Sequence, residues 1–165
     1  MQLNQQRTIH APQATVWAAL NDNEALKACI AGCESMTSSS EFQRTAVVVA
    51  AIGPVRAKFT GKLSLSDIDA PNRFTITFEG QGGAAGFGKG TASVQLQAID
   101  EQTTQLSYQA QVQIGGKLAQ IGSRIVDAAS EKIISDFFTQ FEQYLCPKAP
   151  ETPERAAQAF AGYLG

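Results

Sequence analysis

The chain has 165 residues, of which 44% are hydrophobic and 17% charged, and this fits one globular domain. Its 13 basic and 15 acidic side chains leave a net charge of -2 with no cluster of Lys and Arg, which argues against nucleic acid as the main partner. No run approaches the roughly 20 consecutive apolar residues of a membrane span, and the first residues lack the apolar core of a signal peptide. We therefore expect a soluble, cytoplasmic protein.

The N-terminal quarter of the chain predicts one strand and two short helices. Residues 3–9 alternate in polarity and favour a strand. Pro12 then occupies a preferred first position of a helix in which Val16, Trp17 and Leu20 share one face. A second helix is predicted over residues 22–28, and the serine run at residues 38–40 predicts a turn.

From residue 42 to residue 114 the hydrophobic period changes to two. Runs in which every second residue is apolar are separated by short turns at residues 53–54, 70–72 and 100–103. Such half-apolar strands predict an antiparallel meander with one wet face and one dry face. The dry face must be covered by another element.

The last long apolar pattern predicts that cover. Residues 116–145 carry apolar side chains at spacings of three and four, which favours one amphipathic helix of about 28 residues spanning about 42 Å. The predicted fold class is therefore α+β of the helix-grip kind, a curved antiparallel sheet wrapped around a long C-terminal helix. The predicted stripe consists of Leu118, Ile121, Ile125, Ile133, Phe137, Phe141 and Leu145, widened by Val126, Ile134 and Phe138.

The remaining residues predict a separate tail. Residues 1–146 form the expected globular domain, and residues 147–165 a Pro-rich linker followed by a short amphipathic stretch. Two interpretations of this tail stay open, a frayed end or a segment that docks on a membrane surface or a partner protein.

Cysteine and histidine give little support for catalysis or metal binding. A zinc site would need His10 and Cys146 to converge on Cys29 and Cys33, so three packed, reduced thiols are the simpler interpretation. We predict no metal site and no catalytic residue. His10, Glu79 and Tyr108 are the candidates to test for acid–base chemistry if the protein is an enzyme after all.

The glycine-rich segment at residues 80–90 matches half of a phosphate-binding loop. A phosphate site needs a helix after the glycines, whereas an alternating strand pattern follows here, and Gly90 stands where a magnesium-binding hydroxyl is required. We therefore predict a loop or irregular strand edge in which Phe87 is a mobile apolar plug. The glycines at the start of the long helix have two interpretations, since Gly115, Gly116 and Gly122 could let the helix start close against the sheet or could flex to open a cavity. We favour the second, a cavity gate formed by Gly82, Gly83, Gly86, Gly88, Gly115 and Gly116.

Several motifs resemble one known family. The opening Ile9-His-Ala-Pro-Gln-Ala-Thr-Val-Trp17 is similar to the START or Bet v 1-like (SRPBCC) superfamily. Cys29-Ile-Ala-Gly-Cys-Glu34, Gly53-Pro-Val-Arg-Ala-Lys-Phe-Thr-Gly-Lys62, the glycine-rich segment and Gly115-Gly-Lys-Leu-Ala-Gln-Ile-Gly-Ser-Arg124 resemble the G-subunit of carbon monoxide dehydrogenase, the CoxG family. The resemblance covers residues 1 to about 145.

The resemblance implies a hydrophobic cavity between sheet and helix and an accessory role beside a molybdenum hydroxylase. It further implies a quinone (menaquinone or ubiquinone) or another lipid as ligand, no covalently bound cofactor, and peripheral contact with the inner face of the membrane. Two alternatives stay open, an assembly or recruitment protein without ligand and an enzyme of the cyclase or hydrolase type.

The predicted ligand-binding residues combine apolar positions of the strands with the helix stripe. Large side chains are mixed with small ones on the dry face, and the small ones would leave room for an apolar ligand. The small residues are Ala57, Gly61, Ala92, Ala98 and Ala110. The set comprises Phe59, Leu63, Phe74, Ile76, Phe78, Phe87, Val94, Leu96, Tyr108, Val112, Ile121, Ile125, Ile133 and Phe137.

Overall fold

In the computed structural model, which describes residues 1–145, seven strands form one antiparallel sheet in the order β1-β7-β6-β5-β4-β3-β2. The helices α1 and α2 lie between β1 and β2 in the chain, and α3 and α4 follow β7. The strands are β1 (Gln2–Ile9), β2 (Cys33–Ser40), β3 (Gln43–Ile52), β4 (Val55–Asp69), β5 (Arg73–Gln81), β6 (Phe87–Asp100) and β7 (Thr103–Gly115). The helices are α1 (Gln13–Leu20), α2 (Asn23–Cys29), α3 (Lys117–Gln120) and α4 (Ser123–Leu145).

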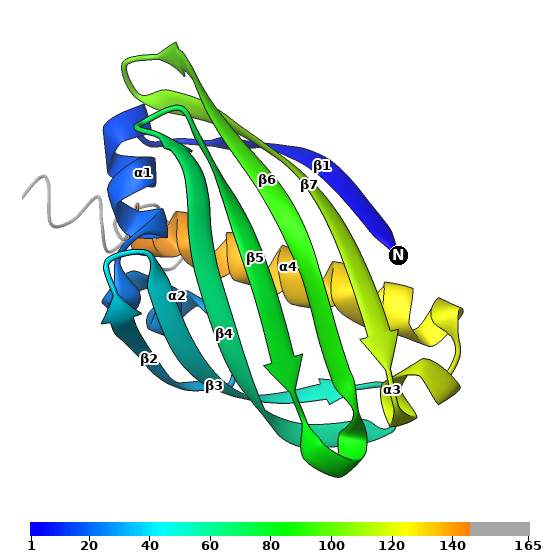
Figure 1. The fold of residues 1–165 in the computed structure, drawn as a ribbon. Helices are drawn as coiled ribbons and strands as arrows, with labels where there is room; N and C mark the ends of the chain where they lie inside the picture. Colours follow the sequence, from blue (N-terminus) through cyan, green and yellow to red (C-terminus); the bar gives the residue numbers. More distant parts are fainter. Residues whose placement is uncertain (146–165) are drawn as a thin grey trace, which may run out of the picture.

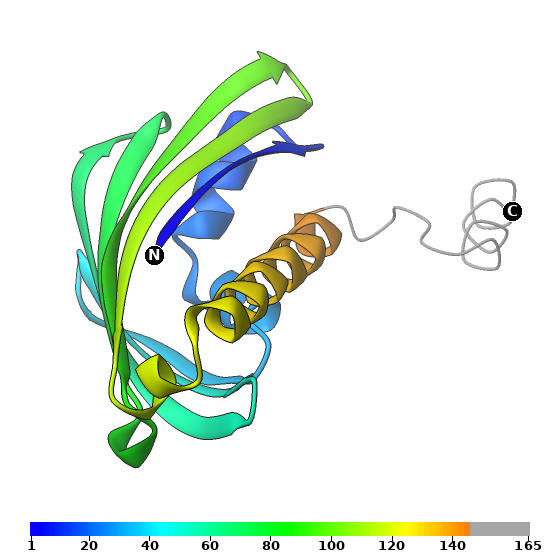
Figure 2. The ribbon, with the colours of Figure 1, turned by 90° about the vertical axis from the view of Figure 1, so that its right-hand side faces the viewer.

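The sheet bends around α4, which lies across its concave side (Figures 1 and 2). Strand alternation explains why this side is covered, because the apolar side chains of β4 to β7 point toward it and the polar ones point away. The predicted helix-grip fold is therefore confirmed.

The long C-terminal helix is shorter than the sequence predicts. The chain forms the four-residue α3, breaks at Gly122 with φ at +99°, and then forms α4 of 23 residues. A left-handed residue cannot continue a right-handed helix, so the single helix predicted over residues 116–145 is wrong.

The first hairpin also differs from prediction. The serines at positions 38–40 end β2 and do not form a turn; the turn follows at Glu41 and Phe42. The sequence of β2 lacks a clear alternation, and the strand exists because it pairs with β3, for example Met36 with Ala46.

The hydrophobic core fills one end of the concave side. Phe141 and Val16 are both 0% exposed there, and Trp17 packs edge-on against Phe74 with ring centroids 5.3 Å apart. The core cluster consists of Ile9, Ala11, Val16, Ala19, Ala25, Cys29, Phe74, Val94, Leu96, Leu106, Phe138 and Phe141. It joins α1, α2 and the C-terminal half of α4 to the middle strands, and we call this the closed end.

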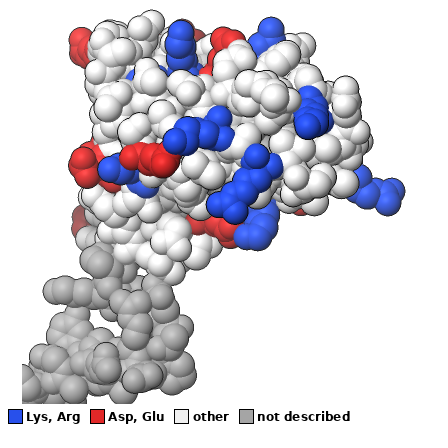
Figure 3. Space-filling view, turned by 90° about the horizontal axis from the view of Figure 1, so that it is seen from below, with Lys and Arg blue, Asp and Glu red and all other residues white. Residues whose placement is uncertain are grey.

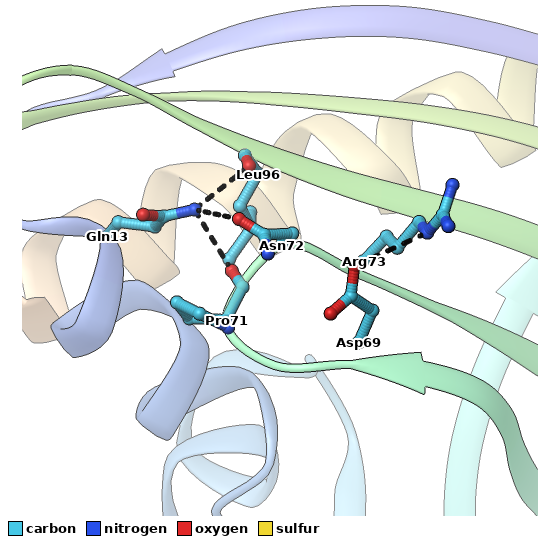
Figure 4. Close-up of polar contacts among 6 residues, drawn as sticks. All are labelled: Gln13, Asp69, Pro71, Asn72, Arg73 and Leu96. Carbon is cyan, nitrogen blue, oxygen red and sulfur yellow. Dashed lines mark hydrogen bonds and ion pairs between the residues drawn. The ribbon is translucent and has the colours of Figure 1, made fainter.

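A glutamine fixes α1 to the sheet at the closed end. Gln13 Nε2 lies 3.2 Å from the carbonyl oxygen of Pro71, 3.1 Å from that of Leu96 and 3.2 Å from Asn72 Oδ1 (Figure 4). One side chain thus connects the first turn of α1 to the β4–β5 turn and to β6. Beside it in Figure 4, Arg73 pairs with Asp69 at 3.8 Å on the exposed surface, where an ion pair contributes little to stability.

Replacing Gln13 by alanine is expected to lower the free energy of unfolding by about 1–2 kcal/mol, because two part-buried carbonyl oxygens lose their donor. Urea denaturation measures the change. Gln97→Ala, an exposed glutamine on β6, is the matched control and should stay within about 0.5 kcal/mol of the wild type. Equal effects of both substitutions would contradict the assigned role.

Candidate functional site

The concave side is incompletely covered at the end opposite the core, which we call the open end. The inward side chains of Phe59, Leu63, Phe78, Val112 and Ile114 are only half-buried and stand outside the core cluster. The apolar positions on the sheet thus divide into a packed half and an accessible half. An accessible apolar wall is a surface on which an apolar ligand gains binding energy.

A cleft of about 490 Å³ opens between the end of β7 and the start of α4. Val112 and Ile114 line it from the strand, and Ala119, Gly122 and Val126 line it from the helical side. Met1, Phe87, Lys89, Gln113, Ser123 and Asp127 complete its rim. Apolar walls with polar groups at the rim are typical of sites for small apolar ligands.

A larger hollow of about 680 Å³ lies over the outer face of the sheet. Its lining includes Lys62, Glu79 and Lys89, which stand side by side across β4, β5 and β6, together with threonines and glutamines of the neighbouring rows. The charged row on this outer face is open to solvent, whereas the cleft lies beside the concave side to which the apolar side chains of the strands point, so we take the cleft as the candidate site.

The two glycine segments predicted as a gate meet at the open end. A Cβ on Gly116 would lie 2.7 Å from the Cα of Gly86, and one on Gly86 would lie 3.1 Å from the backbone nitrogen of Lys117. Glycine permits this approach of two backbones because it has no side chain, and both residues have positive φ. The β5–β6 tip and the β7–α3 turn are therefore neighbours; opening of a gate between them stays a prediction.

Aromatic rings lie against two glycines of the glycine-rich segment. A Cβ on Gly82 would overlap the Phe59 ring, and a Cβ on Gly90 would lie 3.0 Å from Cζ of Phe78. The small residues thus accommodate neighbouring rings rather than only leaving a void. Ala98, predicted to leave room inside, is exposed near the far end of β6.

A small group of polar side chains interrupts the apolar wall where β1 and β7 face α4. The Tyr108 hydroxyl lies 3.4 Å from Gln5 Oε1, and the Tyr108 ring stacks on Phe138 with centroids 6.1 Å apart. The guanidinium carbon of Arg7 lies 5.1 Å from the centroid of the same Phe138 ring. Burial raises the pKa of Tyr108, Arg7 acts to lower it, and Glu131 acts to raise it.

The raised pKa of Tyr108 predicts a loss of stability at alkaline pH. The unfolded chain releases the phenolic proton near pH 10, before the folded chain does, so this contribution is present below about pH 10 and is lost as the pH rises through the raised pKa. Urea denaturation between pH 8 and 11 should show a shallower decline for Tyr108→Phe than for the wild type. Tyr144→Phe, at an exposed ring, is the control, and parallel declines of wild type and Tyr108→Phe would contradict the prediction.

Not all of the predicted ligand-binding residues lie at the open end. Phe74, Val94 and Leu96 are 4%, 9% and 3% exposed in the core cluster, so their side chains fill the closed end, and a contact of these three with a ligand stays a prediction. Ile76, Tyr108 and Phe137 border that core and are half-buried. Phe59, Leu63, Phe78 and Val112 lie on the accessible wall.

The predicted ligand-binding residues of the helix are more exposed than the helical stripe predicts, and their contact with a ligand stays a prediction. Ile125 and Ile133 are 43% and 46% exposed, because the break at Gly122 sets the orientation of α4 and its buried face centres on Val126, Phe138 and Phe141. Ile121 is half-buried, and its Cδ1 would lie 3.7 Å from a Cβ placed on Gly53 in the β3–β4 turn.

Phe87 is a strand residue and not part of a loop. It begins β6, pairs with Gly115 of β7 and rests its ring on that glycine, beside the cleft. Only residues 82–86 of the glycine-rich segment lie outside strands, with Gly83–Ala85 forming a 3-10 turn. The sequence therefore places this segment correctly at a hairpin tip but overstates the length of the loop.

Of the three residues named for acid–base chemistry, Tyr108 alone faces the concave side. Glu79 projects from the outer face, where its Oε1 accepts a hydrogen bond of 2.6 Å from Gln81 Nε2, and His10 is exposed after β1. Within residues 1–145 no three His, Cys, Asp or Glu side chains come together as a metal site. Cys29 is buried, its burial raises the pKa of its thiol, and Cys146 lies outside the described residues.

Charge is unevenly distributed between the two ends. Arg56, Lys117 and Arg124 are exposed near the β3–β4 turn, α3 and the start of α4, and Lys and Arg side chains spread across this end when it is seen from below (Figure 3). Lys58 nearby pairs with Glu34 at 3.1 Å. The turns at the opposite end carry Glu41, Asp69, Asp100 and Glu101. The open end is thus the basic end of the molecule.

Among the helices described, none is long and apolar enough to cross a bilayer. The predicted linker and amphipathic tail at residues 147–165 lie outside the described residues, so both interpretations of the tail stay predictions.

Comparison with known proteins gives a family and a set of folds. The family model of the carbon monoxide dehydrogenase G-subunit (CoxG) matches residues 6–146. No curated protein matches the sequence. A conserved protein from Geobacillus kaustophilus is similar in structure, with a TM-score of 0.84 and 28% identity over 90% of this chain and 97% of that one.

Two more distant structures share the fold alone. A START superfamily protein from Mycobacterium smegmatis has a TM-score of 0.67 and 12% identity, over 87% of this chain and 96% of that one. The Zhui aromatase/cyclase from Streptomyces sp. R1128 has a TM-score of 0.68 and 12% identity, over 92% of this chain and 96% of that one. At such identities the activity of the neighbour does not transfer to this chain.

Proposed function

The chain belongs to the CoxG family of carbon monoxide dehydrogenase, and from this premise we propose that it is a non-enzymatic accessory protein of a molybdenum hydroxylase that carries an apolar ligand. The ligand is a quinone or another lipid. The protein transfers it between the enzyme and the membrane, at which it sits peripherally.

The observation that carries the proposal is the accessible apolar wall beside the cleft of about 490 Å³. Each buried methylene contributes about 0.8 kcal/mol, so a chain of about ten carbons supplies the roughly 8 kcal/mol of micromolar binding without a charged anchor. Tyr108, the one acid–base candidate on this side, has no carboxylate or imidazole among its hydrogen-bond partners in the described chain. That supports binding in preference to proton-transfer chemistry.

Ligand uptake tests the proposal directly. The full chain is purified from its host, extracted with organic solvent and analysed by mass spectrometry, and the emptied protein is titrated with menaquinone and ubiquinone analogues. Binding in the micromolar range supports the proposal. A protein that arrives empty and takes up neither quinone nor fatty acid would overturn it.

A cleft-blocking variant shows where the ligand binds. Ala119 lines the cleft, so Ala119→Trp should fill part of its volume and weaken uptake at least tenfold. Ala128→Trp places the same side chain on the exposed face of α4 and should leave uptake unchanged. Equal uptake by both variants would exclude this cleft as the ligand site.

Association with the enzyme is a second part of the proposal, favoured by the basic open end. We place the contact there, because it would bring the cleft against the partner, and we expect the charge reversals Lys117→Glu and Arg124→Glu to weaken co-purification with the dehydrogenase. Arg73→Glu, at the opposite end, is the control. Deletion of residues 147–165 tests the tail separately, because loss of the enzyme or of membranes on truncation would assign the contact to the tail.

A further inference from the structure

The two strands beside the cleft carry polar side chains on a face that is otherwise apolar. The inward positions of β1 and β7 pair Leu3 with Ala110, Gln5 with Tyr108 and Arg7 with Leu106. Thr104, the remaining polar residue of this face, is fully buried and donates its hydroxyl to the carbonyl oxygen of Ala11 at 2.8 Å. The structural role of Thr104 is thus evident, and Gln5, Arg7 and Tyr108 need another explanation.

Arg7 is the least explained of the three. Within residues 1–145 its guanidinium lies against the face of the Phe138 ring; no described carboxylate lies within 4.0 Å, and no described acceptor receives its side-chain N–H groups. Arg44, the other half-buried arginine of the inner face, differs because its Nη2 donates to the carbonyl oxygen of Asn21 at 2.7 Å and so holds the end of α1, although its buried Nε has no partner among the described residues. The Arg7 nitrogens are not among the buried described groups that lack a partner, so solvent reaches this guanidinium and its five donors are available to an acceptor.

Tyr108 adds a second donor to the same place. Its hydroxyl is 3.4 Å from Gln5 Oε1, a long contact that a closer acceptor can replace. Both Tyr108 and Arg7 lie against Phe138, so their donors converge at one point on the apolar wall. Burial also keeps the phenol protonated, which is the form that donates.

The position of this group relative to the cleft sets the shape of the ligand. Tyr108 and Val112 are four residues apart on β7, which is about 14 Å along the strand. An apolar body that extends from the cleft along β7 would therefore bring an oxygen at its end to the Arg7 and Tyr108 donors. The polar end would lie at the β1 edge of the sheet, where the contact between Tyr108 and Gln5 is exposed, and the apolar end in the cleft.

We propose that Arg7, Tyr108 and Gln5 form a head-group site that binds an oxygen acceptor, a carbonyl or a carboxylate, at the end of the apolar ligand. This inference rests on the proposed function, since it specifies the ligand of the same cleft. Arg7 and Tyr108 donate hydrogen bonds to the oxygen, and the Tyr108 hydroxyl turns to it from Gln5 Oε1, which accepts this hydrogen bond in the free protein. The two sources of such an oxygen, a quinone and a fatty acid, are distinguished by the test.

The experiment compares three probes of similar length on the emptied full chain: a decyl-substituted benzoquinone, dodecanoate and dodecane, each competing with a fluorescent apolar dye. The wild type should bind at least one oxygen-bearing probe about tenfold or more tightly than dodecane. Arg7→Met keeps the apolar stem and should abolish that preference. Tyr108→Phe should reduce the preference for the quinone over dodecane about tenfold.

The controls separate this inference from the proposed function. Arg56→Met removes an exposed arginine at the open end and should bind all three probes as the wild type does. Arg7→Lys, which keeps the charge, should retain more affinity for dodecanoate than Arg7→Met, and a loss confined to dodecanoate assigns the head group as a carboxylate.

Equal binding of all three probes by the wild type, or an unchanged preference in both Arg7→Met and Tyr108→Phe, would overturn the head-group site while apolar uptake stands. Uptake of no probe at all would overturn the proposed function as well.

Discussion

Replacing Gly86 by alanine is expected to lower the free energy of unfolding by about 3 kcal/mol or more. Two effects add at this position. The residue has φ at +111°, where a side chain is strained, and its new Cβ would overlap the Gly115 carbonyl and lie 3.1 Å from the Lys117 nitrogen. Because both neighbours are backbone atoms, they cannot rotate away, and the β5–β6 tip must separate from the β7–α3 turn. Chemical denaturation measures the loss.

Gly83 provides the matched control for this prediction. It also has positive φ, at +60°, but a Cβ there would meet nothing within 4 Å. Gly83→Ala should therefore cost only the backbone strain, about 1 kcal/mol. If Gly83→Ala and Gly86→Ala lowered the free energy of unfolding equally, the close contact of the two turns would not be the reason for a glycine at position 86. Hydrogen exchange of residues 113–118 in Gly86→Ala should rise above the wild-type rate, since their packing partner has moved.

Replacing Phe141 by alanine should cost about 3–5 kcal/mol, the range for removing a large buried aromatic side chain. Phe141 is 0% exposed, and its ring stacks on Phe137 with centroids 5.5 Å apart. The cavity left behind would lie among α1, α4 and the middle strands, where the core is densest. Thermal or urea unfolding checks the value.

Phe42→Ala is the control for the loss of a phenylalanine as such, because Phe42 is 48% exposed in the β2–β3 turn. Its expected effect is within about 0.5 kcal/mol. A small cost for Phe141→Ala would mean that the closed end is as accessible as the open end. The core would then not be the part of the molecule that holds the sheet on α4.

Ligand uptake should respond differently to Gly86→Ala and Phe141→Ala. Phe141 lies in the core cluster at the closed end, whereas Gly86 joins the turns next to the cleft. A Gly86→Ala protein that remains folded should therefore show altered uptake kinetics, while a folded Phe141→Ala protein should retain access to the cleft. This contrast connects the stability of the open end to the proposed carrier role.

Much of the fold follows from the sequence alone. The strict alternation in β4 to β7 identifies both the strands and their dry face, since a period of two places every second side chain on one side. The apolar residues of α4 identify an amphipathic helix as the cover, and the motifs around Gly53 and Gly115 identify the family that the CoxG match confirms. These signals are local, so no knowledge of distant contacts is needed to interpret them.

The composition of the site depends on contacts that the sequence does not contain. Arg7 is an arginine on a short strand, and its place beside Phe138 arises from the register of β1 against β7 and from the position of α4. The only signal in the sequence is the alternation of the first strand, which places Arg7 on the same face as Leu3 and Ile9. Likewise, the exposure of Ile125 and Ile133 follows from how α4 is rotated after Gly122, which helical spacing does not determine.

The sequence by itself determined that one sheet with a dry concave face would be covered by one helix, because side-chain periodicity is a property of each segment taken separately. Only the tertiary structure decided which half of that face is packed and which is accessible. That division depends on where α1, α2 and the C-terminal half of α4 converge, as Phe141 and Val16 show, and convergence of distant segments is a property of the folded chain.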